Sequence, residues 1–155
     1  MSPELTPFEK LLVALVRGGV DFTVVGGVAC ALNGHVRTTE DVDLLIARDA
    51  ANVARLLDVL RKVGEGHARE LCPDDFSDEE GAIRVVEDFP IDIFVRIGGR
   101  HLEDLRQHIC HCDIGSVPVT FLSVEGLILL KAGSAREKDR LDVAALRRLL
   151  SSQQD

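Results

Sequence analysis

Two aspartates lie among apolar residues in the stretch EDVDLLI, where Asp41 and Asp43 flank Val42. Burying carboxylates among Val, Leu and Ile is unfavourable unless a cation neutralises them. Because side chains alternate between the two faces of a β-strand, both carboxylates would share one face with Leu45, while Val42 and Leu44 build core from the other. The sequence therefore predicts a strand that aims an acidic pair into one cleft.

A third aspartate has a similar setting in the stretch FPIDIFV, where Asp92 would point away from the inward-packing Ile91 and Ile93. If the two strands are neighbours, Asp41, Asp43 and Asp92 converge. Three close carboxylates resist being ionised together, and a divalent cation reverses that penalty. Oxygen ligands of this kind suit Mg²⁺ or Mn²⁺ rather than zinc. Two such ions activate an attacking hydroxyl and hold a triphosphate for in-line displacement.

A glycine pair, Gly26 and Gly27, follows one β-like run and opens a short helix. Glycine lets a backbone approach phosphate closely, and the start of a helix presents unpaired N–H groups. Each feature alone is weak, because a lone D-x-D is usually a strand edge or turn and Asp92 alone reads as an ordinary surface residue. The combination favours a metal-dependent site over coincidence.

The periodicity of apolar residues and the capping patterns predict the elements that must position this site. Helices are expected from the capping box at Thr6 to Gly18, from Gly26 to Gly34, and over 53–63, 102–109, 123–130 and 139–150. Strands are expected over 21–25, 42–46, 82–86, 90–97, 110–114 and 117–121, with an acidic loop over 65–81. This order predicts an α+β fold in which helices flank a small mixed β-sheet. We expect a single domain over 1–150 and a frayed tail over 151–155.

Composition narrows the function classes. The chain has 155 residues, is 46% hydrophobic and carries a net charge of -8. That charge disfavours extensive nucleic-acid binding, and the absence of Trp and Tyr removes most base-stacking side chains. No apolar run approaches the roughly 20 residues that span a bilayer. Because the N-terminus also lacks a signal-peptide pattern, we expect a cytoplasmic protein with no membrane association.

The four cysteines include no C-x-x-C pair, so neither a disulfide framework nor a zinc ribbon is indicated. The run HICHC, from His108 to Cys112, contains donor atoms, but a strand would place them alternately on opposite faces. Ordinary packing is therefore favoured there over a zinc site.

The pattern as a whole resembles the DNA polymerase beta-like nucleotidyltransferase superfamily, and within it the small bacterial minimal nucleotidyltransferases of the antitoxin and toxin type. Its glycine pair, D-x-D and third aspartate match Gly26, Gly27, Asp41, Asp43 and Asp92 position by position. The stretch GHVRTTEDVDLLI resembles the form G-x-x-R-x-T-x-D-h-D of one branch, where h is apolar. The stretch LKAGSAREKDRLDVAAL resembles that branch's K…R-x-K-D…D…L segment, with an extra Ser-Ala before the arginine; the matching positions are Lys131, Arg136, Lys138, Asp139 and Asp142.

The resemblance implies a nucleotidyltransferase-like fold and Mg²⁺-dependent transfer of a nucleoside monophosphate from a nucleoside triphosphate, such as ATP, to a hydroxyl acceptor, with release of pyrophosphate. It implies that Asp41 and Asp43 hold the nucleotide-bound metal, and that Asp92 helps bind a second metal and favours deprotonation of the acceptor. The residues that would bind the triphosphate are Gly26, Gly27, Arg37, Thr39, Lys131 and Lys138.

These nucleotide contacts have plainer alternatives. Arg37 could form a loop salt bridge with Glu40, Thr39 could only shape the turn, and Lys131 and Lys138 could be a solvated helix end. The acceptor is open among a protein partner, RNA and a small molecule such as an aminoglycoside or lincosamide. For drug modification the chain looks short unless it forms a homodimer. The alternative function is a non-catalytic or weakly catalytic toxin–antitoxin binding module that pairs with a helical partner protein.

Overall fold

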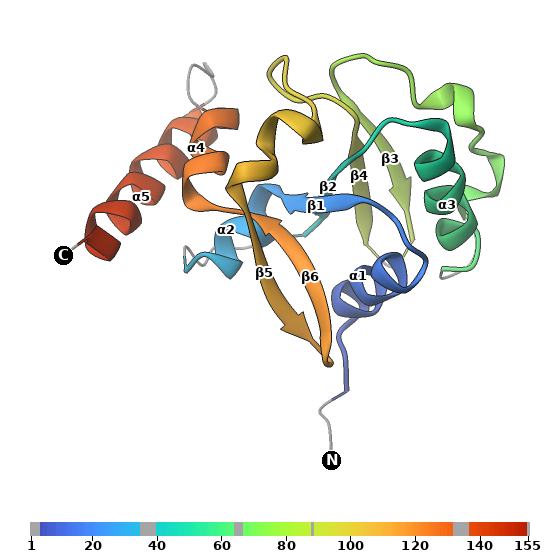
Figure 1. Ribbon diagram of the computed structural model, residues 1–155, viewed down its shortest axis with the longest axis horizontal. Helices are drawn as coiled ribbons and strands as arrows, with labels where there is room; N and C mark the ends of the chain where they lie inside the picture. The colour runs from blue at the N-terminus through green and yellow to red at the C-terminus, as the bar shows by residue number, and fades with distance from the viewer. Residues whose placement is uncertain (1–3, 35–39, 64–66, 88, 132–136, 155) are drawn as a thin grey trace.

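Six strands form one mixed sheet in the computed structural model, which describes residues 4–34, 40–63, 67–87, 89–131 and 137–154 (Figure 1). The strands are β1 (Phe22–Val25), β2 (Val42–Ile46), β3 (Ala82–Val86), β4 (Pro90–Phe94), β5 (Ile109–Ile114) and β6 (Val117–Leu122). Their order across the sheet is β3-β4-β2-β1-β6-β5. Strands β3 and β4, β1 and β2, and β5 and β6 pair antiparallel, whereas β2 with β4 and β1 with β6 pair parallel.

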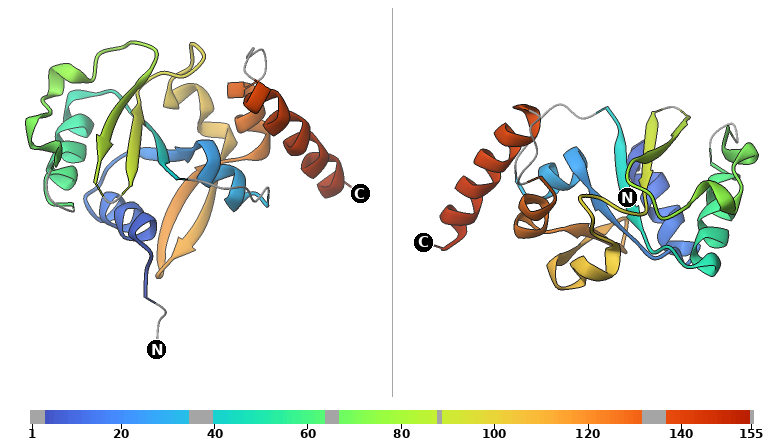
Figure 2. Two further views of the ribbon diagram at one scale, coloured as in Figure 1. Left: turned by 180° about the vertical axis from the view of Figure 1, so that it is seen from behind. Right: turned by 90° about the horizontal axis from the view of Figure 1, so that it is seen from above.

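Helices flank this sheet. They are α1 (Pro7–Arg17), α2 (Gly26–Leu32), α3 (Ala50–Leu60), α4 (Val124–Lys131) and α5 (Glu137–Gln154), with 3₁₀ turns η1 (His67–Glu70), η2 (Pro73–Asp75) and η3 (Leu102–His108). Helices α3 and α5 lie on opposite sides of the molecule in every view (Figures 1 and 2). The expected α+β fold with a small mixed sheet is confirmed.

Helix α1 begins where the sequence predicted it. The Thr6 hydroxyl accepts a hydrogen bond from the Glu9 backbone N–H, and the Glu9 carboxylate accepts one from the Thr6 N–H, which together form a capping box. Leu11, Leu12 and Leu15 then recur on one face and are almost completely buried. Their burial packs α1 against the sheet, so the apolar face rather than propensity alone holds the helix.

Strand β2 is the centre of the sheet, and four of its five residues are buried. Val42 and Leu44 lie on one face as expected. Leu45, which shares the other face with Asp43, is also fully buried. The acidic face of β2 therefore continues as hydrophobic core beyond Asp43, and the polar region is confined to one end of the strand.

The buried side-chain amide of Asn52 joins α3 to the ends of strands β1 and β2. The Asn52 Oδ1 accepts from the Asp21 N–H at 2.7 Å, and its Nδ2 donates to the carbonyls of Asp21 at 2.9 Å and Ala47 at 2.8 Å. Asp21 precedes β1 and Ala47 follows β2. The side chain thus fixes how the ends of the two strands meet, at the opposite end from Asp43.

Some boundaries differ from the sequence predictions. The fourth strand ends at Phe94 rather than at 97, because the chain leaves the ladder and turns through Gly98 and Gly99, which both have positive φ. Helix α3 begins at Ala50, since Asp49 caps it. The predicted loop over 65–81 contains two 3₁₀ turns and contributes the buried Phe76.

The last helix also differs, because α5 runs through Gln154 where a frayed tail was expected from 151. The division into one domain and a tail stays a prediction. Among the helices of the described ranges, none is long and apolar enough to cross a membrane.

Candidate active site

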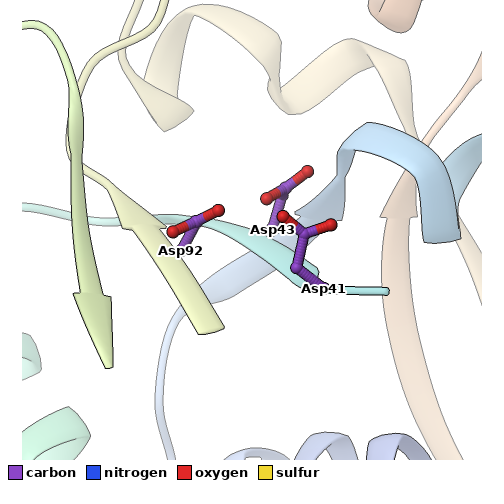
Figure 3. A group of neighbouring side chains, drawn as sticks. All are labelled: Asp41, Asp43 and Asp92. Atoms are coloured by element: carbon purple, nitrogen blue, oxygen red, sulfur yellow. The ribbon is translucent and has the colours of Figure 1, made fainter. Parts of the chain in front are cut away.

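Three carboxylates meet at one end of the central strands. Strands β2 and β4 pair in parallel with Asp43 directly opposite Asp92. Asp41 comes two residues before Asp43 and therefore lies on the same face. One oxygen from each of the three side chains lies within 4.8 Å of the others. Figure 3 shows the carboxylates of Asp41, Asp43 and Asp92 turned toward a common space.

The three groups have different electrostatic environments. Burial, and then repulsion from Asp41 and Asp92, raise the pKa of Asp43 to about 7. Asp92 is only 7% exposed, yet hydrogen bonds from Arg84 lower its pKa despite that burial. Ionising Asp43 beside the other two carboxylates is therefore unfavourable in the metal-free protein, and a bound cation would relieve that repulsion.

The donor set fits a divalent cation that prefers oxygen. All three ligands are carboxylates, and neither sulfur nor imidazole belongs to the group. Such a set suits Mg²⁺ or Mn²⁺ better than zinc. A bound cation would favour the ionised form of Asp43, whose pKa is raised in the metal-free protein.

Gly26 completes one wall of the cluster. It follows β1, whose last residue, Val25, pairs with Asp43. Gly26 has a φ of +68°, and a β-carbon added there would lie 2.8 Å from Asp43 Cγ and closer still to Oδ2. A side chain at this position is therefore excluded twice, by backbone conformation and by the Asp43 carboxylate. Gly27 is buried immediately after it in α2.

Arg84, the cation that lies against the cluster, was not among the site residues predicted from the sequence. From β3, its Nε donates to Asp92 Oδ1 and its Nη2 to Asp92 Oδ2, both at 2.8 Å, and Nη2 also reaches Asp41 Oδ2 at 3.3 Å. A signal was available in the sequence. A β3–β4 hairpin that pairs Val86 with Pro90 necessarily pairs Arg84 with Asp92.

The Lys131 side chain is paired and mostly buried, so it is not the solvated helix end that the sequence left open. Its ammonium lies 2.9 Å from Asp142 and 3.4 Å from Asp139, both on α5, and the side chain is 13% exposed. Its positive charge nevertheless acts on Asp43, whose pKa it lowers slightly against the larger effects that raise it. Lys131 therefore sits near the carboxylates while it links α4 to α5.

Other candidate residues lie outside the described part of the chain. Arg37 and Thr39 fall within 35–39, as do His35 and Thr38, and Arg136 falls within 132–136. Lys138 belongs to α5, but its side chain is not described. Their proposed contacts with a triphosphate stay predictions.

The cysteine–histidine run does not form a second cluster of ligands. Cys110 and Cys112 are half-buried on one face of β5, whereas the intervening His111 is exposed. The four cysteines, all of them described, form no disulfide. Within the described ranges, Asp41, Asp43 and Asp92 are the one group of three or more potential metal ligands.

The sequence of the chain matches a known protein family over almost its whole length. A family model described as "Nucleotidyl transferase of unknown function" (DUF2204) matches residues 5–154. No curated protein matches the chain.

Several solved structures share the fold at low sequence identity. An antigenic nucleotidyltransferase-like protein from Paracoccidioides brasiliensis has a TM-score of 0.54 at 20% identity, over 92% of this chain and 76% of its own. The antibiotic-resistance factor ANT(2'')-Ia has a TM-score of 0.60 at 16% identity, over 95% and 82%. The lincomycin-bound lincosamide antibiotic adenylyltransferase LnuA has a TM-score of 0.60 at 14% identity, over 95% and 99%.

Proposed function

Because the chain belongs to the nucleotidyl transferase family of unknown function DUF2204, we propose that it transfers a nucleoside monophosphate from a nucleoside triphosphate to a hydroxyl acceptor. The reaction depends on divalent cations and releases pyrophosphate. The observation that carries this proposal is the convergence of Asp41, Asp43 and Asp92 from two parallel neighbouring strands, beside the start of α2. A half-buried carboxylate such as Asp43 beside two others is costly to ionise without a cation, which supports a metal-binding role.

The three aspartates have separate roles in this proposal. Asp41 and Asp43 hold the cation that accompanies the triphosphate. Divalent cations bound there would stabilise negative charge on the phosphates and lower the pKa of the acceptor hydroxyl. Asp92 would help bind a second cation and favour deprotonation of the acceptor hydroxyl, whose proton passes to solvent. The hydroxyl oxygen then bonds to the α-phosphorus as the bond to pyrophosphate breaks.

Two further features support nucleotide binding. Gly26 lets the Asp43 carboxylate lie directly against the backbone where α2 begins, so a cation held by Asp43 would bring a triphosphate close to the first N–H groups of that helix. Lys131 supplies positive charge near the cluster, and its pairing with Asp139 and Asp142 fixes where that charge lies. We propose that this ammonium stabilises the departing pyrophosphate.

The acceptor proposed is the hydroxyl of a small molecule or of a protein partner rather than of RNA, since the net charge of -8 opposes extensive contact with RNA. Chain length gives no reason to exclude a small molecule. LnuA, a lincosamide antibiotic adenylyltransferase, is covered over 99% of its own chain by this protein.

The test is a transfer assay with purified protein, Mg²⁺ and each of the four nucleoside triphosphates. Aminoglycosides, lincosamides and a protein extract serve as acceptors in separate arms. We expect pyrophosphate release, together with a mass increase of one nucleoside monophosphate on an acceptor. Both signals should disappear with EDTA and in Asp43→Asn. Absence of transfer in every arm, together with absence of nucleotide and metal binding at millimolar concentrations, would refute the proposal.

A further inference from the structure

The Arg84 guanidinium lies beside the carboxylate cluster, and both the strand register and a pair of hydrogen bonds place it there. Its cross-strand partner in the β3–β4 ladder is Asp92 itself. Two parallel hydrogen bonds of 2.8 Å join the guanidinium to both oxygens of Asp92, and a third contact of 3.3 Å reaches Asp41. Two of the three proposed metal ligands are thus engaged by a single cation of the chain.

Metal and arginine would compete for the same carboxylates. A divalent cation at Asp41 and Asp92 takes lone pairs and negative charge that the guanidinium uses in this arrangement. If Arg84 stayed in place, its guanidinium and the bound divalent cation would lie close together, and two positive charges repel at short range. Binding of a metal ion at Asp92 is therefore opposed by the Arg84 contact.

Arg84 has room to withdraw. It lies on β3, the edge strand of the sheet, and its side chain is 56% exposed. Lys131, by contrast, is 13% exposed and held by two aspartates of α5. Of these two cations near the cluster, Arg84 is the one whose own charge stays hydrated when it exchanges its carboxylate partners for water, and a bound divalent cation would then balance the buried Asp92 carboxylate.

We propose that Arg84 is a built-in counter-ion that holds Asp92 and Asp41 in the metal-free protein and must release them when a divalent cation binds. This inference rests on the proposed function, because it assumes that the cluster is a metal site. It adds a residue that sets how tightly the metal binds, and it explains how three close carboxylates coexist before any ion arrives.

The experiment measures Mn²⁺ binding to the full chain without nucleotide, by calorimetry and by the electron paramagnetic resonance signal of free Mn²⁺. Arg84→Gln removes the charge and the paired hydrogen bonds. We expect it to bind Mn²⁺ about tenfold more tightly than wild type, the effect of losing one charged hydrogen-bond pair at an exposed site. Arg48→Gln is the matched control, because Arg48 is 57% exposed and pairs with Asp78 at 2.9 Å, outside the cluster. It should leave Mn²⁺ affinity unchanged.

A second variant separates the paired hydrogen bonds from charge alone. Arg84→Lys keeps the charge but cannot contact both oxygens of Asp92 in the same way. If the bidentate contact is what competes, Arg84→Lys shifts toward the tighter affinity of Arg84→Gln. Wild-type affinity in Arg84→Lys, with tighter binding in Arg84→Gln, supports a counter-ion that acts through its charge alone. Unchanged or weaker affinity in Arg84→Gln overturns the inference.

Asp43→Asn separates failure of this inference from failure of the proposed function. If wild type binds Mn²⁺, Asp43→Asn does not, and Arg84→Gln equals wild type, the counter-ion role is wrong and the metal site stands. If neither wild type nor Arg84→Gln binds Mn²⁺, with or without nucleotide, both proposals are wrong.

Discussion

The Asp43 carboxylate lies against the backbone of Gly26, at a distance that leaves no space for a β-carbon on the glycine. Gly26 directly follows Val25, the last residue of β1, and Val25 pairs with Asp43 in the β1–β2 ladder. The register of β2 with β4 places the same Asp43 directly opposite Asp92. A substitution at Gly26 should therefore act on the site through Asp43.

Gly26→Ala should abolish metal binding and transfer while costing about 1–2 kcal/mol of stability, because the new methyl group displaces Asp43 and the φ of +68° disfavours alanine. The measurements are Mn²⁺ affinity and the free energy of unfolding in urea. Gly99→Ala is the matched control, since Gly99 has a φ of +75° with nothing within 4 Å of an added β-carbon. It should lose similar stability and keep its Mn²⁺ affinity. Normal Mn²⁺ affinity in Gly26→Ala would contradict the geometry.

The metal-free protein should lose stability as pH rises, relative to an Asp43→Asn variant. The pKa of Asp43 is raised in the folded state from 3.8 to about 7, so the unfolded chain ionises first as pH increases. The resulting penalty is absent below about pH 4, grows between pH 4 and 7 and is complete above pH 7. After allowance for screening it amounts to about 1–3 kcal/mol.

The measurement is urea unfolding of wild type and Asp43→Asn from pH 4 to 8 in EDTA. Asp58→Asn is the control, because Asp58 is exposed and pairs with Lys62 on the helix surface. Its difference from wild type should stay small throughout. A stability difference between wild type and Asp43→Asn that does not change with pH would show that folding does not raise the pKa of Asp43.

Asn52→Ala should destabilise the fold by about 2–4 kcal/mol, because it removes three hydrogen bonds of a fully buried side chain and leaves backbone groups of Asp21 and Ala47 with fewer partners. Chemical denaturation measures this loss. A cost under about 1 kcal/mol would mean that water replaces the amide and that Asn52 does not fix the strand ends.

Thr23→Val, unlike Asn52→Ala, should not destabilise the fold. The Thr23 hydroxyl is fully buried in β1 and has no hydrogen-bond partner among the described residues. Valine has the same shape without the unsatisfied hydroxyl, so stability should stay unchanged or rise by up to about 1 kcal/mol. Thermal unfolding of the variant beside wild type measures this difference, and a clear loss would reveal a hydroxyl partner.

The local parts of the site could be predicted from sequence, because alternation along one strand fixes which side chains share a face. That reasoning placed Asp41 with Asp43, and Asp92 opposite its apolar neighbours. Whether the two strands touch depended on the sheet order, which alternation alone does not reveal. The structure supplies it by placing β4 directly beside β2.

The long-range contacts were beyond single-strand patterns. Arg84 contacts the cluster through hairpin register, and Lys131 meets Asp142 only because α5 packs on α4. A charged residue on an apolar strand reads as a solvent-facing position unless its cross-strand partner is identified. Pairing the β3 and β4 sequences residue by residue is what would have exposed the Arg84–Asp92 contact.

The central claim, that Asp41, Asp43 and Asp92 together hold the divalent cation of a nucleotidyl transfer site, has a direct crystallographic test. Crystals are grown with Mn²⁺ and a non-hydrolysable nucleoside triphosphate, and anomalous diffraction locates the manganese. We expect an anomalous peak bound by these three carboxylates, with the triphosphate beside Gly26 and with Arg84 no longer paired with Asp92. A nucleotide bound elsewhere, or no manganese peak while Arg84 still contacts Asp92, would contradict it.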